Sequence, residues 1–221
     1  MLAETFEILQ RELGKAVIET IQMMAISMIS ALILGTLLGL LLYITSNQMF
    51  VKQKVVNTVA EVVVNVIRSI PFVILMVLCI PLMQALVGTN IGPKAAAIPL
   101  SIAAIAFLAR LVDGAFREVD TGVIEAALST GASLPLILRK VVFVEAFPGL
   151  LRAFTVTFVN LIGFSAMAGL VGGGGIGNLA IQYGYYRYET GVMIITVLIL
   201  VVVVQVAQNF GDFLARKATK R

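Results

Sequence analysis

The sequence has no histidine, one cysteine and few charged residues, and each of these shortages excludes something. Histidine is the commonest general base and metal ligand, so its absence argues against most catalytic and metal-dependent functions. Cys79 lies in an apolar run and has no second cysteine with which to form an intramolecular disulfide or a C-x-x-C motif. The N-terminal residues lack the basic-then-apolar order of a signal peptide, so we expect no cleaved leader. These absences predict a protein that is not an enzyme and binds no metal.

Charge is scarce because 13% of the 221 residues are charged, whereas 60% are hydrophobic. Soluble domains contain about 25% charged and about 45–50% apolar residues. A water-soluble fold of this size could not bury so much apolar surface, so the expected solvent is a lipid bilayer. The composition therefore predicts an all-α polytopic protein that crosses the cell membrane (inner or plasma membrane) several times.

Long stretches without charge mark the candidate membrane spans. Four of them contain between 22 and 34 uncharged residues, and they lie between Glu19 and Lys52, Arg68 and Lys94, Arg152 and Arg187, and Glu189 and Asp212. Each is long enough, because about 20 apolar residues cross the hydrocarbon core. A fifth candidate, 95–109, has 15 uncharged residues and contains Pro99. It reaches full length only if the flanking Lys94 and Arg110 extend from its ends to the interface.

The distribution of lysine and arginine predicts the orientation. With five spans, 12 basic residues lie on one side and 4 on the other, so the first side is cytoplasmic. A four-span arrangement that leaves 95–109 uncrossed gives the same count. Five spans place the N-terminus outside and the C-terminus in the cytoplasm. We expect one transmembrane domain over 16–212, followed by a basic cytoplasmic tail at 213–221 that contacts lipid.

Glycines are concentrated in "GLVGGGGIGN", where Gly172, Gly174 and Gly177 fit the spacing G-x-G-x-x-G of a dinucleotide-binding loop. That mechanism needs a preceding strand, a following helix and an acid about 20 residues further on. The only acid nearby is Glu189, 12 residues after Gly177, and the predicted topology places the loop outside the cell. We therefore interpret the glycines as an outer hinge or packing device, comprising Gly172, Gly173, Gly174, Gly175 and Gly177. The adjacent tyrosines, Tyr183, Tyr185, Tyr186 and Tyr188, are expected at the outer interface.

The cytoplasmic segment 120–140 predicts two short helices joined by a glycine. Thr121 or Gly122 can cap a helix that runs to about Thr130, and Gly131 occupies the position of a left-handed C-cap. Ser133 and Pro135 can then start the second helix.

Two interpretations of this helical pair remain open from its residues alone. Ala126 and Ala127 present a small surface beside Glu125, which suits docking into a groove on another protein. Alternatively, the pair lies on the bilayer surface, with Arg139 and Lys140 against anionic lipid.

"EAALSTG" (Glu125 to Gly131), followed by a second helix, resembles the EAA loop of the membrane subunits of binding-protein-dependent ABC importers. The segments "RSIPFVIL", "VGTNIGP" and "FSAMAGLVGGGGIGNLAIQYGYYRY" are similar to the methionine-importer permeases, so the likeness covers nearly the whole chain. The family usually has a proline near the end of the second helix, where this chain has Val144. Pro148 follows four residues later, which indicates a shifted helix end.

The resemblance implies a homodimer of five-span subunits with two cytoplasmic ATP-binding subunits and an extracytoplasmic methionine-binding lipoprotein. It implies coupling helices at about 121–144, in which Glu125, Ala126, Ala127 and Gly131 meet the ATPase. ATP and Mg²⁺ would be used by that partner, because this chain has no G-x-x-x-x-G-K-[ST] motif and is expected to bind no cofactor and no nucleic acid.

Polar and small residues inside the spans suggest further sites. Ser27, Ala31, Gly35 and Gly39 recur every four residues, a pattern that favours close helix packing within the subunit over a dimer seam or pore lining. Thr157, Asn160 and Phe164 share one helical face and are candidates for a translocation path, although such polar groups also form interhelical hydrogen bonds.

Arg68 is expected at the cytoplasmic membrane boundary, as an anchor or as a partner of Glu61.

A secondary transporter or channel that works without an ATPase is the alternative function, and a structural membrane subunit is a third. Against the alternative stand the lack of an internal repeat and the lack of acidic residues within the four long spans.

Overall fold

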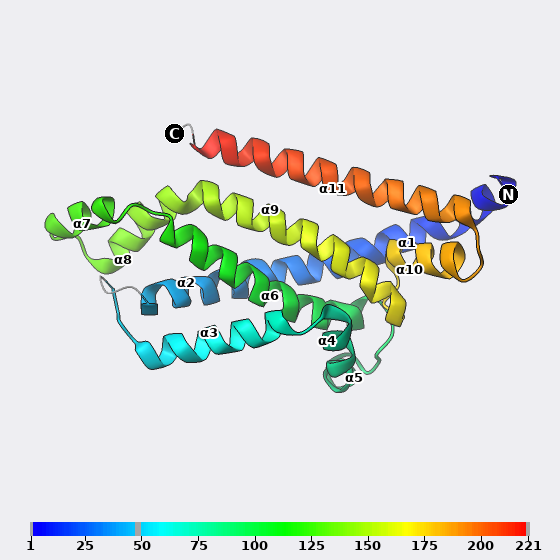
Figure 1. Ribbon diagram of the computed structural model, residues 1–221, viewed down its shortest axis with the longest axis horizontal. Helices are drawn as coiled ribbons and strands as arrows, with labels where there is room; N and C mark the ends of the chain where they lie inside the picture. The colour runs from blue at the N-terminus through cyan, green and yellow to red at the C-terminus, as the bar shows by residue number, and fades with distance from the viewer. Residues whose placement is uncertain (1, 47–49, 220–221) are drawn as a thin grey trace.

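The computed structural model describes residues 2–46 and 50–219, and within these ranges all regular secondary structure is helical. Long helices run side by side along the long axis of the molecule (Figure 1). The N-terminus and the glycine-rich segment lie at one end, whereas the short helices α7 and α8 lie at the other. The arrangement confirms the predicted all-α class.

The described elements follow one another without a strand between them. In chain order they are α1 (Leu2–Ser30), η1 (Ala31–Gly35), α2 (Thr36–Ser46), α3 (Lys54–Ser69), α4 (Phe72–Leu78), α5 (Ile80–Val87), α6 (Pro93–Arg117), α7 (Thr121–Ser129), α8 (Leu134–Ile137), η2 (Leu138–Val142), α9 (Phe143–Ala168), η3 (Gly169–Val171), α10 (Gly175–Leu179), η4 (Ala180–Tyr185) and α11 (Thr190–Thr219). The expected domain bounds, 16–212 with a tail at 213–221, do not coincide with the ends of helices. The first helix begins at Leu2, and the tail residues up to Thr219 are part of α11.

Four helical stretches are long and apolar enough to cross a bilayer: Glu4–Ser46, Pro93–Arg117, Leu134–Val171 and Thr190–Thr219. A fifth crossing is available if the bent pair α3 and α4 counts as one span. The two termini lie toward opposite ends of the bundle, which agrees with an odd number of crossings (Figure 1).

The expected span between Arg68 and Lys94 is wrong as a continuous helix. That segment is divided into the short helices α4 and α5, and α4 bends 105° away from α3. Pro71 causes the break, because proline lacks a backbone N–H and forces the preceding residue into an extended conformation. Ile70 accordingly has φ −79° and ψ 124°. The second crossing instead begins at Lys54, so its first half lies before the charge-free stretch.

The expected span between Arg152 and Arg187 is also shorter than its charge-free length. The helix ends at Val171, and residues 172–187 form the glycine-rich hairpin described below.

The segment 95–109 is part of a 25-residue helix, α6, despite Pro99 and the charges near its inner end. α6 lies at the centre of the bundle and contacts α1, α2, α3 and α9. Its side chains Leu100, Leu108, Val112 and Phe116 are fully buried. The fifth candidate span is therefore the core helix of the subunit.

The small-residue stripe lets the first helix approach α6 closely, as the pattern predicted. The hydroxyl of Ser27 donates to the carbonyl of Ala97 at 3.2 Å. A Cβ atom on Gly39 would lie 2.6 Å from the carbonyl oxygen of Ala109. The stripe therefore packs inside the subunit, because only small residues permit such close backbone contact.

We predict that Gly39→Ala lowers the unfolding temperature of the purified protein in detergent, because the new methyl group meets backbone that cannot move aside. The matched control is Gly14→Ala, since Gly14 is also inside a helix and a Cβ atom added to it would meet nothing within 4 Å. It should raise the stability by up to about 1 kcal/mol through helix propensity. Equal shifts for the two variants would contradict the close-packing argument.

Thiol labelling tests the five crossings. In a Cys79→Ser background, the exposed positions Glu7→Cys and Thr219→Cys should react from opposite sides of the membrane. A membrane-impermeant maleimide should label Glu7→Cys on intact cells, whereas Thr219→Cys and the control Ser129→Cys should need permeabilisation. Labelling of both ends from one side would mean an even number of crossings.

Candidate functional site

The helix–glycine–helix segment at the end of the bundle has the predicted geometry with one change. The N-cap is Asp120 and not Thr121 or Gly122, because its carboxylate accepts the N–H of Gly122 at 2.7 Å. Gly131 has φ +77°, the left-handed conformation that favours glycine, and its N–H donates to Leu128 at 2.9 Å. Ser133 is the N-cap of α8, as expected.

Helix α7 is anchored by one face and free on the other. Ile124 is 1% exposed and belongs to the main core, and Leu128 packs against it. Glu125 and Ala126 are exposed, whereas Ala127 is half-buried against the core. Because Ile124 and Leu128 are covered by the protein itself, the opposite face with Val123, Glu125 and Ala126 is available for another macromolecule. This favours docking over attachment to the bilayer surface.

The second helix of the pair does not end near Val144. α8 continues through η2 into α9, and Leu134–Val171 forms one helical stretch of 38 residues. Pro148 lies inside α9 without ending it. A displacement of α7 and α8 is therefore transmitted directly to a membrane-spanning helix.

A buried carboxylate joins three helices next to this segment. Asp113 is 2% exposed and accepts from Arg117 Nε at 2.8 Å and from Arg110 Nη1 at 3.4 Å. Arg110 also lies 3.9 Å from Glu61 of α3, and Arg117 Nη2 donates to the hydroxyl of Ser46 in α2 at 2.9 Å. Removing one partner of such a buried pair is costly, because the other charge is left uncompensated.

This cluster was not predicted from the sequence. Its signal was the spacing of Arg110, Asp113 and Arg117, which places all three on one face of a helix. The expected pair between Glu61 and Arg68 does not form, since Glu61 faces Arg110.

Arg68 does not lie at the end of α3 that is near α7. It lies 14 residues after Lys54 in α3, which places it about 21 Å along the helix axis. The start of α3 is at the end of the bundle that carries α7 (Figure 1). Within residues 2–46 and 50–219, Arg68 has no ion pair or hydrogen bond. Arg68 lies in the last turn of α3, and its side chain is exposed in the isolated subunit. Charged side chains within membrane segments are costly to insert and usually face a polar path or a partner.

A cavity of about 210 Å³ lies beside Arg68, between the α3–α4 bend, α6 and α9. Asn160 and Phe164 of α9 line it, as do Ala103 and Phe107 of α6. Two of the three residues proposed for a translocation path are therefore brought together with an arginine.

Thr157, the third, lies elsewhere. It is 1% exposed, and its hydroxyl donates to the carbonyl of Ala153 at 2.8 Å.

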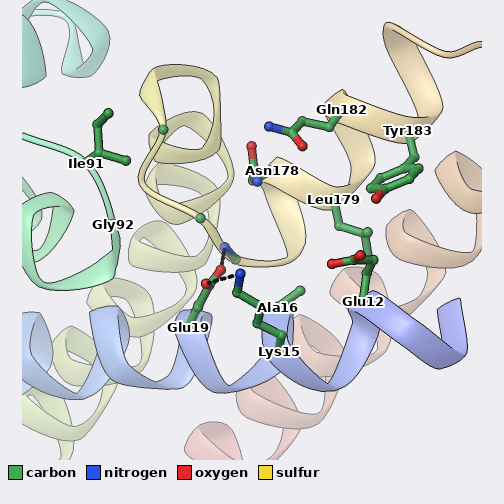
Figure 2. Close-up of a pocket in the computed structure, with 13 residues that line it drawn as sticks. Glu12, Lys15, Ala16, Glu19, Ile91, Gly92, Asn178, Leu179, Gln182 and Tyr183 are labelled. Carbon is green, nitrogen blue, oxygen red and sulfur yellow. Dashed lines mark hydrogen bonds and ion pairs between the residues drawn. The ribbon is translucent and has the colours of Figure 1, made fainter. Parts of the chain in front are cut away.

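The glycine-rich segment forms a hairpin held by α1 (Figure 2). The N–H of Gly175 donates to the carboxylate of Glu19 at 2.8 Å, and the N–H of Ile176 donates to the hydroxyl of Thr20 at 2.9 Å. Glu19 also lies 3.9 Å from Lys15. The amides that would bind a phosphate already have oxygen partners, which argues against the dinucleotide interpretation.

The glycines of the hairpin meet two separate requirements. Gly172, Gly174 and Gly175 have φ between +80° and +85°, which side chains rarely adopt. Gly173 and Gly177 have φ in the ordinary range, but a Cβ atom on either would collide with the end of α9. The hairpin therefore folds back tightly on α9.

A pocket of about 330 Å³ opens between this hairpin and α1 (Figure 2). Glu12, Lys15, Glu19, Asn178 and Gln182 contribute its polar groups. Tyr183 is buried at its edge, where Arg11 donates to its hydroxyl at 3.3 Å. The other three tyrosines are exposed, as expected for an interface. No group of three or more acidic, histidine or cysteine side chains suited to a metal occurs in the described ranges.

Comparison with known proteins shows which protein family this chain matches. Residues 35–220 match the family described as "Binding-protein-dependent transport system inner membrane component". The "Probable D-methionine transport system permease protein MetI" of Vibrio cholerae is 44% identical over 220 residues, which cover 100% of this chain and 98% of that protein. The "Methionine import system permease protein MetP" of Bacillus subtilis is 44% identical, with 82% of each chain covered.

Solved structures agree with the sequence comparison. A chain from inward-facing structures of the MetNI methionine ABC transporter has a TM-score of 0.89 and 40% identity, and the match covers 93% of this chain and 95% of that one. A chain from an amino acid ABC transporter crystallised with histidines has a TM-score of 0.78 at 22% identity and supports the fold. The chain is thus a multi-pass membrane protein that belongs to the family of binding-protein-dependent transport system inner membrane components.

Proposed function

We propose that this chain is the permease subunit of an ATP-driven importer whose substrate is methionine. The observation that carries the proposal is α7, which is anchored by Ile124, exposes Glu125 and Ala126, and is followed by a continuous helix across the membrane. A docking helix joined in this way to a spanning helix suits a subunit driven by a partner. The permease names of its relatives and the fold shared with a methionine ABC transporter support the same function.

The working assembly is a homodimer of this chain with two cytoplasmic ATP-binding subunits and an extracytoplasmic binding lipoprotein. ATP and Mg²⁺ are used by the ATP-binding subunits, since this chain has no P-loop motif to hold them. The α7–α8 segment is the coupling element, in which Glu125, Ala126 and Ala127 meet the ATPase and Gly131 sets the turn.

Closure of the two ATPases would displace α7, and three connections carry this displacement into the membrane. α8 continues directly into α9. Asp113 and Arg117 join α6 to Ser46 of α2 near the start of α7. Arg110 joins α6 to Glu61 of α3. Because these contacts are buried or charged, the helices move as a unit, which suits a rigid-body change between inward-open and outward-open states.

The glycine hairpin belongs to the opposite end of the molecule and acts as an outer hinge or packing device. Glu19 ties it to α1, so motion of α9 is passed to α1 on the far side from ATP. The pocket in Figure 2 lies beside this hairpin, so in the proposed topology it belongs to the outer end, where a binding protein would deliver substrate.

Charge reversal tests the coupling role. Glu125→Lys should leave membrane insertion and expression intact, because the side chain is exposed, but should reduce substrate-stimulated ATPase activity and uptake by at least tenfold. The measurement is uptake of radiolabelled substrate and ATP hydrolysis by the reconstituted complex. Gly131→Val should act in the same direction, because φ +77° strains a β-branched residue.

The matched control for Glu125→Lys is Asp212→Lys, which reverses an exposed acid of α11 outside the coupling segment. This variant should transport at the original rate. Normal uptake by Glu125→Lys at normal expression would remove α7 from the coupling role.

Substrate identity is tested with the complete transporter. Proteoliposomes that contain this chain, its ATPase and its binding protein should accumulate methionine in an ATP-dependent way. Lysine and glutamate should be transported at least tenfold more slowly, because the residues that line the cavity beside Arg68 include no second charged side chain to pair with a charged cargo side chain. Accumulation without ATP, or no accumulation of methionine at all, would contradict the proposal.

A further inference from the structure

The geometry points to Arg68 as the group that binds the carboxylate of the transported amino acid, in the cavity between the α3–α4 bend, α6 and α9. This inference rests on the proposed function, because it takes a methionine-like amino acid as the cargo. It assigns an intramembrane substrate site to residues of this chain.

Arg68 lacks a partner within the subunit. Its guanidinium has no hydrogen bond or ion pair within residues 2–46 and 50–219, whereas Arg110 and Arg117 both contact Asp113. An arginine presents a planar fork of donors that matches a carboxylate. A free amino acid carries that carboxylate, so the cargo supplies the partner that the subunit does not.

Seven of the nine residues that line the cavity have apolar side chains. Apart from Arg68, the only polar side chain among the described residues that line the cavity is the amide of Asn160. The rings of Phe72 and Phe164 stack with their centroids 4.6 Å apart and 11° between their planes. Aromatic walls make favourable contacts with a thioether sulfur. One cation, one amide and an apolar lining suit an amino acid with an uncharged side chain.

The break between α3 and α4 places a partially negative helix end beside the positively charged Arg68. α3 ends at Ser69, and the C-terminal end of a helix carries partial negative charge on its last carbonyls. Ile67, Arg68 and Ile70 at this end all line the cavity. Interrupted membrane helices commonly form binding sites in transporters, and the C-terminal end of α3 is suited to the substrate ammonium group. The carboxylate and ammonium groups thus meet opposite charges.

The size of the cavity agrees with a small ligand. Its volume of about 210 Å³ is below the range of about 300–1,000 Å³ that is typical of pockets for drug-sized molecules. A single amino acid is of the appropriate class, whereas an oligopeptide is too large.

Thiol protection tests the site in the permease–ATPase complex without the binding protein, so that recognition by that protein does not contribute. Ala103 lines the cavity, and Ala103→Cys in a Cys79→Ser background provides a single reactive thiol. Methionine should slow its reaction with a small methanethiosulfonate at least fivefold. Methioninol, which keeps the ammonium group and lacks the carboxylate, should protect much less.

The substitution Arg68→Gln should abolish the difference between methionine and methioninol. Lys52→Gln is the matched control, because it removes an exposed cation before the start of α3 and should leave the protection unchanged. A preference for methionine over methioninol that survives in Arg68→Gln would overturn the inference. If Arg68→Gln does not assemble with the ATPase, Arg68→Lys carries the test, since it keeps the charge but loses the fork and should give a reduced preference.

Uptake by the complete transporter separates this inference from the proposed function. Methionine uptake by the original chain, with at least a tenfold loss in Arg68→Gln, supports both. Equal uptake by the two chains overturns the site and leaves the importer intact. No methionine uptake by the original chain overturns the proposed function, and with it the site.

Discussion

Every backbone N–H and C=O inside a bilayer must find its partner within the protein, because no water is there to supply one. The described chain satisfies this with helices and places each interruption beside protein. The break at Pro71 lies against α6 and α9. The glycine hairpin rests on α1, where Glu19 and Thr20 accept its exposed amides. A cavity or a pocket thus opens beside each of these two interruptions.

The most deeply buried charge of the bundle also has its partners within the protein. Asp113 is almost completely buried, and its two arginines, together with Glu61, make a cluster with no net charge. That cluster joins α2, α3 and α6 at the end of the bundle that carries the coupling segment. Arg68 has no ion pair within the described residues, and it lines the cavity at the α3–α4 bend. The buried cluster stabilises the packing of three helices, whereas the position of Arg68 in the cavity is the basis of the proposal that it binds substrate.

The two ends of the molecule are linked by continuous helices and not by flexible loops. α9 joins the coupling segment directly to the glycine hairpin, and the hairpin is tied to α1 by Glu19. Close approaches at Gly39 and Gly177 leave little room for sliding. A displacement imposed on α7 therefore reaches the outer side as movement of packed helices, which suits alternating exposure of a central site.

Composition, charge asymmetry and local glycine chemistry determined the membrane class and the left-handed Gly131, because these depend on nearest neighbours and on the solvent, whereas charge counting alone allowed four spans or five. The small-residue stripe was predicted correctly for the same reason, since period and side-chain size are visible in one segment. Counting charges misplaced the second span, because a charge-free stretch does not reveal that Pro71 ends the helix within it. Two outcomes were decided only by how α3, α6 and α9 pack: Glu61 pairs with Arg110 and not with Arg68, and Asn160 lines the cavity whereas Thr157 does not. Contacts between helices depend on their relative rotation, which no single segment encodes.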